Sequence, residues 1–150
     1  TEGELIHYKG LPSFSPELFR FIENADPLKS KQLAKGIDQL MDEGVAQLFT
    51  SVYNGRKIVG TVGALQLEVI EYRLLHEYGA KCRWEPVQFH KAVWFTSDND
   101  AQITDFKNRK NRQLAKDKHG RDVFLPDSGY ELDMAREKFP DIKFYLTSEF

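Results

Sequence analysis

The dipeptide Asn54-Gly55 is the feature that most restricts the fold of this chain. It separates two runs with alternating or β-branched character, "VAQLFTSV" before it and "KIVGTV" after it. Asn-Gly between two such runs is typical of a tight β-hairpin, because both residues tolerate the positive φ that the turn requires. The sequence therefore predicts an antiparallel strand pair here, and a fold that contains a sheet.

Two long helical segments flank this hairpin. The first begins near Asp26-Pro27, a capping residue followed by a proline suited to the first helical position, and ends near Gly44. The second runs from about Ala64 to Tyr78 and ends at Gly79. Apolar residues recur at helical spacing in the first segment, and we expect them to be buried: Leu28, Leu33, Ile37, Leu40 and Met41.

Further strands are expected outside these helices. Leu5 to Tyr8 predicts a first strand, and "AKCRWEPVQF" predicts a fourth that ends near Pro86. Ser15-Pro16 predicts a short helix that buries Leu18, Phe19 and Ile22. Residues from about 4 to 90 then follow the order strand, helix, strand, strand, helix, strand, which is the ferredoxin-like βαββαβ unit. Its antiparallel sheet carries both helices on one face.

The rest of the chain predicts a C-terminal extension of the βαβαβ type that packs on the first unit and covers its open face. The 150 residues suit one α+β domain, and the halves at 4–90 and 91–150 are not separated by a linker rich in Gly, Pro or Ser. No internal repeat is evident. The extension is expected to contain a strand at 91–97, a helix at 98–117 with Ile103, Phe106 and Leu114 on one face, a strand at 121–126, a helix at 127–140 and a strand at 141–150.

Composition excludes several classes of protein. The net charge of -2 gives the chain no bulk attraction for nucleic acid or for an anionic membrane. The one cysteine, Cys82, cannot form an internal disulfide, so an oxidising compartment is not indicated. No apolar run approaches the roughly 18 residues of a membrane-spanning helix, and the N-terminus has no signal-peptide pattern. We expect a soluble cytoplasmic domain without a membrane partner.

Gly60 and Gly63 stand between the return strand and the second long helix, where several folds bind a phosphate group. A phosphate loop also needs a Lys and a Ser or Thr after its second glycine, but Ala64, Leu65 and Gln66 stand here. We therefore predict that both glycines form a structural corner that permits a tight turn and close packing. No other pattern predicts a catalytic, cofactor or metal site, since Cys82 and the histidines lack metal-ligand spacing.

Positive charge is concentrated in one window of the sequence. Seven basic residues and one acid give residues 107–121 a formal charge of +6, which leaves -8 for the remaining chain. These side chains could contact RNA phosphates, or they could form a solvated surface balanced by acidic neighbours in the fold. Base stacking on the sheet is not expected, because "RKIVGTV" has no aromatic residue. The candidate contact residues are Lys107, Arg109, Lys110, Arg112, Lys116, Lys118 and Arg121.

Long stretches of the chain resemble a known family. "GLPSFSPELFRFIENADPLKSKQLAKGIDQLMDEGVAQLF" and "IVGTVGALQLEVIEYRLLHEYG" resemble the C-terminal domain, domain III, of bacterial peptide chain release factor three, the class II release-factor GTPase. "AREKFPDIKFY" is similar to the closing helix and strand of that domain, and residues 1–4 resemble the end of the preceding β-barrel domain. The first half also resembles domain III of elongation factor EF-G, where a similar glycine corner starts a helix without binding nucleotide.

The resemblance implies a non-catalytic, ribosome-contacting domain of a translation-termination GTPase. That GTPase promotes dissociation of class I release factors from the ribosome after peptide release. GTP or GDP and Mg²⁺ would be held by a GTPase domain preceding Thr1, so this chain is expected to bind no cofactor and to be no enzyme. Expected partners are the rRNA and proteins of the ribosome and the factor's own GTPase and β-barrel domains, and we expect a monomer. The alternative is a free-standing ferredoxin-like regulatory or ligand-sensing domain.

Overall fold

The computed structural model describes residues 15–147, which form a mixture of helices and strands. The predicted α+β class is confirmed. The strands are β1 (Leu18–Asn24), β2 (Gln47–Ser51), β3 (Lys57–Thr61), β4 (Cys82–Pro86), β5 (Val93–Thr96), β6 (Leu114–Asp117), β7 (Asp122–Phe124) and β8 (Lys143–Tyr145). The helices are α2 (Ser30–Asp42), α3 (Ala64–Tyr78), α4 (Asp100–Arg109) and α5 (Gly129–Lys138), with 3-10 turns η1 (Pro27–Lys29) and η2 (Asn111–Gln113).

All eight strands belong to one antiparallel sheet in the order β4-β1-β3-β2-β6-β7-β5-β8. The first half, β1 to β4, follows the chain order strand, helix, strand, strand, helix, strand, and so does the second half, β5 to β8. The strand order of the second half is that of the first in reverse, with β2 and β6 side by side at the junction. The molecule therefore contains the ferredoxin-like arrangement twice, a repeat that the sequence did not make evident.

The first strand of the sheet lies later in the chain than predicted. β1 occupies the segment that was expected to form a short helix after Pro16, and the helix prediction is wrong. The segment extends because its backbone pairs with β3 on one side and β4 on the other. The hydroxyl of Ser15 does not cap a helix; it accepts a hydrogen bond from the amide of Ala92 at 2.9 Å. The strand predicted at Leu5 to Tyr8 lies outside the described residues.

The hairpin and the second long helix are confirmed. β2 and β3 pair antiparallel across a turn in which Gly55 has φ +73°. Helix α3 has the predicted bounds and ends at Gly79, whose φ is +67°. Asp26 caps the turn η1 and Gly44 follows the end of the first helix with φ +80°. Leu28, expected in the core, is 87% exposed because it belongs to η1.

The helix predicted at 98–117 is too long. Helix α4 ends at Arg109, and Leu114 begins the strand β6 where it was expected on a helix face. Leu, Ala and Lys favour helix locally, but the backbone of β6 pairs with β2 and β7, and Gly120 with φ +80° lies in the turn to β7. Because β6 pairs with a strand on each side, this segment is extended and not helical. The second half is therefore βαββαβ and not βαβαβ.

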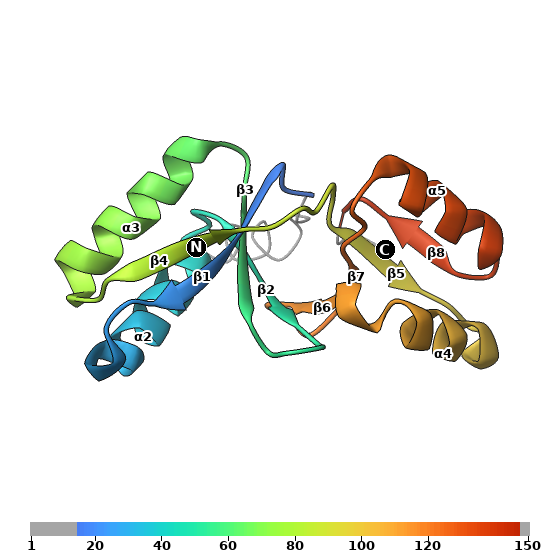
Figure 1. Ribbon diagram of the computed structural model, residues 1–150, viewed down its shortest axis with the longest axis horizontal. Helices are drawn as coiled ribbons and strands as arrows, with labels where there is room; N and C mark the ends of the chain where they lie inside the picture. The colour runs from blue at the N-terminus through green and yellow to red at the C-terminus, as the bar shows by residue number, and fades with distance from the viewer. Residues whose placement is uncertain (1–14, 148–150) are drawn as a thin grey trace, which may run out of the picture.

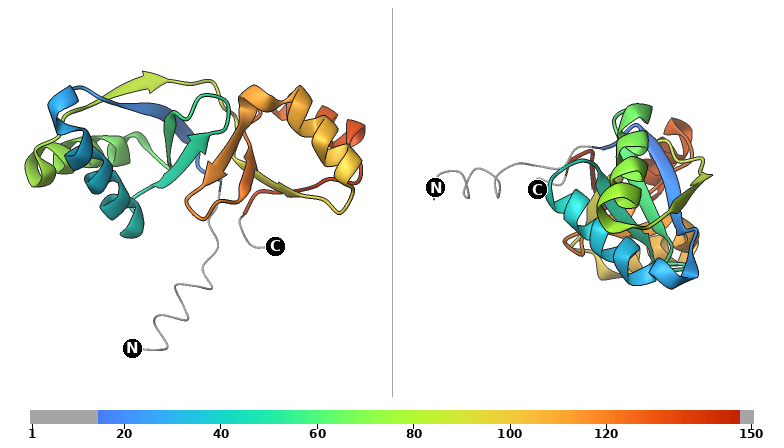
Figure 2. Two further views of the ribbon diagram at one scale, coloured as in Figure 1. Left: turned by 90° about the horizontal axis from the view of Figure 1, so that it is seen from below. Right: turned by 90° about the vertical axis from the view of Figure 1, so that its left-hand side faces the viewer.

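Helices cover only the outer faces of this sheet. Figures 1 and 2 show α2 and α3 at one end of the molecule and α4 and α5 at the other. Each helix pair buries an apolar cluster against its own strands. The two faces without helices pack on each other in a third cluster, in which the rings of Phe49 and Trp94 lie 6.2 Å apart. The second half therefore both continues the first sheet at β2 and contacts its open face.

Candidate functional site

The backbone amides at the glycine corner are already hydrogen-bonded. The side-chain oxygen of Gln66, in the first turn of α3, accepts from the amides of Val62 at 2.7 Å and Gly63 at 3.1 Å. The hydroxyl of Thr61 donates to the carbonyl of Gly63 at 2.9 Å. A phosphate at a helix N-terminus would need such amides free. These contacts fix the entry into α3 and occupy two of the amides at the corner.

The two corner glycines differ in their surroundings. A Cβ at Gly60 would lie 2.5 Å from Cγ of Pro16 and 3.3 Å from the ring of Phe49, so this position permits only glycine without a shift of its neighbours. A Cβ at Gly63 would meet no atom within 4 Å, and its φ of -143° is extended. The prediction of close packing therefore describes Gly60, whereas Gly63 is the cap position of α3 and has open space around it.

The basic window is largely paired with acids. Six of its seven basic residues have an acidic partner within 4.0 Å, which favours the balanced-surface interpretation for these six. The pairs are Lys107–Asp122, Lys116–Asp122, Lys110–Glu131, Arg109–Asp105, Arg121–Asp117 and Lys118–Asp42. The last pair joins the β6–β7 turn to the end of α2 in the other half. Lys107 and Lys116 meet at Asp122, whereas Lys118 and Lys110 pair with acids of other elements.

Asp122 is the acid shared by two of these cations. Its carboxylate lies 2.5 Å from the ammonium of Lys116 and 3.3 Å from that of Lys107. Partial burial raises the pKa of Asp122, but the two ammonium groups together outweigh burial and hold this pKa below its usual value. One carboxylate thus balances one of the two ammonium charges, and the trio keeps a net charge of +1.

Arg112 is the basic residue of the window for which the described residues supply no acidic partner. Its guanidinium lies 5.1 Å from the ring centre of Tyr53, which is 54% exposed at the tip of the β2–β3 hairpin. The neighbouring backbone is fixed, because the amide of Val52 donates to the carbonyl of Leu114 at 3.0 Å. Sequence reasoning named Arg112 but missed Tyr53. Its position beside the Asn54-Gly55 turn was the available signal.

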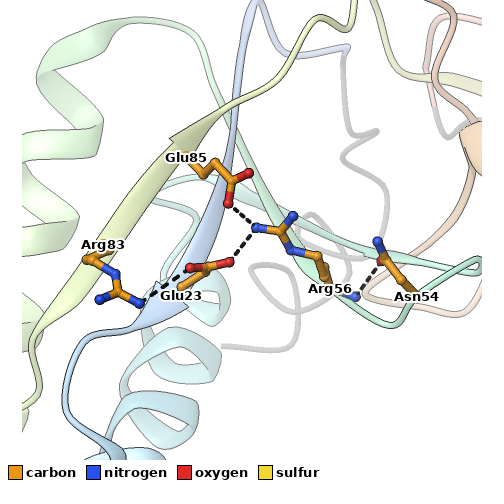
Figure 3. A network of polar contacts seen from close by, with 5 residues as sticks. All are labelled: Glu23, Asn54, Arg56, Arg83 and Glu85. Atoms are coloured by element: carbon orange, nitrogen blue, oxygen red, sulfur yellow. Dashed lines mark hydrogen bonds and ion pairs between the residues drawn. The ribbon is translucent and has the colours of Figure 1, made fainter.

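A second charged cluster lies on β1, β4 and the end of the hairpin (Figure 3). Arg56 bridges the carboxylates of Glu23 and Glu85, each at 2.5 Å, and Arg83 lies 3.6 Å from Glu23. The guanidinium of Arg56 also lies 3.7 Å above the ring of Phe21. The hydrogen bond from Arg56 lowers the pKa of Glu85 and raises that of Arg56. Two cations and two anions cancel, so this cluster cross-links strands and offers no net charge to a ligand.

A groove of about 690 Å³ lies beside the glycine corner. Its walls come from the end of α2, the strands β2 and β3, and the turn after β6. The charged residues Asp42 and Lys118 on its wall pair with each other. Glu43 and Asp117 also line the groove, and each has a basic partner, Arg73 and Arg121. The groove contains no cluster of like charges that would identify a ligand.

No chemistry-bearing cluster is present in residues 15–147. These residues contain no group of three or more His, Cys, Asp or Glu placed to hold a metal ion. Burial, with a smaller effect from the charge of Glu71, raises the pKa of the Cys82 thiol to about 11, so the thiolate is scarce at neutral pH. Among the helices described, none is long and apolar enough to cross a membrane.

A comparison with protein families gives one match that extends over both halves. The family model for the class II release factor RF3, C-terminal domain, matches residues 8–136. The matched range includes every strand from β1 to β7 and most of α5.

Proposed function

Since this chain belongs to the family of class II release factor RF3 C-terminal domains, we propose that it is the ribosome-contacting, non-catalytic domain of a translation-termination GTPase. It is a release-factor domain, and its process is translation termination in protein biosynthesis. The parent factor promotes dissociation of class I release factors after peptide release and acts in the cytoplasm. GTP or GDP and Mg²⁺ bind in its GTPase domain, which with the β-barrel domain adjoins this one, and the factor works as a monomer.

The observation that carries this proposal is the family match across residues 8–136. The corner at Gly60 and Gly63 supports a structural rather than nucleotide-binding role, because the side chain of Gln66 engages the amides there. The ferredoxin-like arrangement alone would not support any particular function, since it hosts many.

Deletion of the domain from the full-length factor tests the proposal directly. We expect the truncated factor to lose affinity for 70S ribosomes in co-sedimentation and to stop accelerating class I factor departure. GTP affinity measured by calorimetry should be retained by the truncated factor and absent from residues 1–150 alone. Unchanged ribosome binding, or tight GTP binding by the 150-residue chain, would contradict the proposal.

Arg112 gives a sharper test of RNA contact within the basic window. Arg112→Glu in the full-length factor should weaken ribosome binding, more strongly at low salt, because this cation is not neutralised by an acid of the described fold. The matched control is Arg109→Glu, which makes the same change of charge beside Asp105. The slope of log affinity against log salt should fall by about 1 for Arg112→Glu. Unchanged ribosome affinity in both variants would make the whole window a solvated surface, and an equal loss in both would remove the distinction drawn for Arg112.

A further inference from the structure

The outward face of α3 carries exposed apolar side chains beside Glu68 and His76, and the ring of His76 lies 4.1 Å from that of Tyr72. Leu65, Val69 and Tyr72 follow one another at helical spacing and lie opposite the buried face of the same helix. Their side chains are 70%, 39% and 64% exposed. Val62 precedes the helix and is 70% exposed, and Leu75 is 40% exposed on the flank. These five residues are called the α3 stripe below.

A helix on the surface of a domain usually presents polar residues to water. Helix α3 does bury an apolar face, formed by Leu67, Ile70 and Leu74, so the α3 stripe is a second apolar face and not the core side of the helix. Figures 1 and 2 show α3 on the outside of the first half, away from the other half. A contiguous exposed apolar surface of this kind marks an interaction site.

The helix that carries the α3 stripe is held rigidly. Arg73 pairs with Glu77 one turn along α3 and with Glu43 at the end of α2, each at 2.7 Å. The indole N–H of Trp84 on β4 donates to Glu71 at 2.8 Å. A preorganised apolar surface loses little conformational entropy when a partner binds.

The charge beside the α3 stripe is negative. Glu68 is exposed on its flank and has no ion-pair partner among residues 15–147, and Glu71 has only the neutral indole of Trp84. Arg73 is shared by two carboxylates, so it leaves one negative charge. RNA phosphates would be repelled here, whereas a protein surface with Lys or Arg around apolar side chains is complementary.

We propose that the α3 stripe docks a basic protein surface of the ribosome, and not rRNA. This inference rests on the proposed function, because it takes ribosome association as its premise. The apolar side chains supply the buried contact, with Tyr72 as its aromatic anchor. Glu68 and Glu71 fix the sign of the charge that the partner must carry.

Site-specific crosslinking in the full-length factor tests the nature of the partner. A photoreactive benzoylphenylalanine replaces Tyr72, and in a control variant it replaces Tyr130, an aromatic on α5 of the other half that is 74% exposed. With factor bound to 70S ribosomes, we expect Tyr72 variants to crosslink to a ribosomal protein at several times the Tyr130 yield. Crosslinks to rRNA, to another domain of the factor, or at the control yield would overturn the inference.

A charge series at one stripe position tests the complementarity. Leu65→Lys and Leu65→Glu remove the same apolar side chain but add opposite charges, so the Lys variant should lose about tenfold more ribosome affinity than the Glu variant. The control is Leu28→Lys, which places the same charge at a leucine that is 87% exposed and outside the stripe. Equal loss for both Leu65 variants, or a Leu65→Lys loss no larger than that of the control, would overturn the inference.

These outcomes separate the inference from the proposed function. If the wild-type factor needs this domain to bind ribosomes but the Leu65 variants behave like the Leu28 control, the function stands and the stripe proposal fails. If deletion of the domain leaves ribosome binding intact, both fail. Circular dichroism of each variant shows whether α3 stays folded, and a folded Leu65→Lys variant that binds normally counts against the inference.

Discussion

The two halves of this molecule have the same topology but fill their cores differently. In the first half, α2 and α3 have 13 and 15 residues and bury mainly aliphatic side chains. In the second half, α4 and α5 have 10 residues each, and the core is dominated by phenylalanine. Shorter helices and strands contribute fewer side chains, and larger side chains compensate. One topology is therefore compatible with two packing solutions.

The tightest packing in the two cores involves different residue types, aromatic rings in the second half and a glycine in the first. Phe106 lies fully buried at the centre of the second core, with the rings of Phe95, Phe124, Phe139 and Phe144 at 5.0, 5.1, 5.2 and 5.6 Å. In the first core the helices approach each other at a glycine. A Cβ at Gly36 on α2 would lie 2.6 Å from a methyl carbon of Leu74 on α3.

The largest expected effect is the loss of the central ring of the second core. Phe106→Ala should lower the free energy of unfolding by about 3–5 kcal/mol, because it removes a buried ring and its aromatic contacts and leaves a cavity. Leu74→Ala, at an equally buried position of the first half, should cost about 2–4 kcal/mol. Urea denaturation measures both. A smaller cost for Phe106→Ala than for Leu74→Ala would remove the proposed difference between the cores.

The second prediction concerns the junction where both halves meet. One oxygen of Asp117 accepts from the indole N–H of Trp94 at 3.0 Å, and the other accepts from the amides of His119 and Arg121 at 2.9 Å. Asp117→Asn keeps the shape but removes the negative charge and replaces one acceptor oxygen with an NH₂ group, so we expect a loss of about 2–3 kcal/mol. Near-UV circular dichroism should report a change around Trp94. A loss below about 0.5 kcal/mol would show that the junction does not depend on this carboxylate.

The glycine corner of the first half permits a matched pair of substitutions. Gly60→Ser should cost about 1–2 kcal/mol, because its Cβ would overlap Pro16. Gly63→Ser has space around it and places a better capping side chain at the start of α3, so it should be neutral or stabilising by about a few tenths of a kcal/mol. Thermal unfolding compares the two. Equal destabilisation would mean that the corner needs both glycines, as the sequence alone suggested.

The smallest expected effect comes from the ion pairs of the second half. The pKa of Asp122 is lowered, so its carboxylate stabilises the fold above the unfolded-state pKa of about 3.9, and this contribution is lost as the pH falls through the folded-state pKa. Asp122→Asn should cost at most about 1 kcal/mol at neutral pH, because partly exposed pairs are screened. The difference between variant and wild type should narrow below pH about 4. A difference that grows on acidification would contradict this assignment.

Sequence reasoning succeeded where local chemistry determines the structure. Asn54-Gly55 located the hairpin, and Gly79 located the end of α3, because Gly55 and Gly79 adopt the positive φ that glycine favours, whereas Asn54 does not. It failed for β1 and β6, whose conformations are decided by the strands on either side. Local preference carries no information about those partners.

The candidate site was also predicted only in its local part. The sequence identified the basic window, but the acids that neutralise it come from distant positions, as in the pair of Lys118 with Asp42. The stacking of Arg112 on Tyr53 joins the second half to the hairpin of the first. No local pattern could have selected Arg112 from its six basic neighbours. It differs from them in having no acidic partner among the described residues, and several of their partners come from distant positions.

The β2–β6 pair also has a mechanical consequence. If only residues 87–92 joined the halves, each could rotate about that segment. Here a rotation would shear the backbone hydrogen bonds between the two strands and separate the apolar faces around Phe49 and Trp94. The domain is therefore stiff across its long axis, and a force applied to α3 at one end is transmitted through the sheet to α4 and α5 at the other.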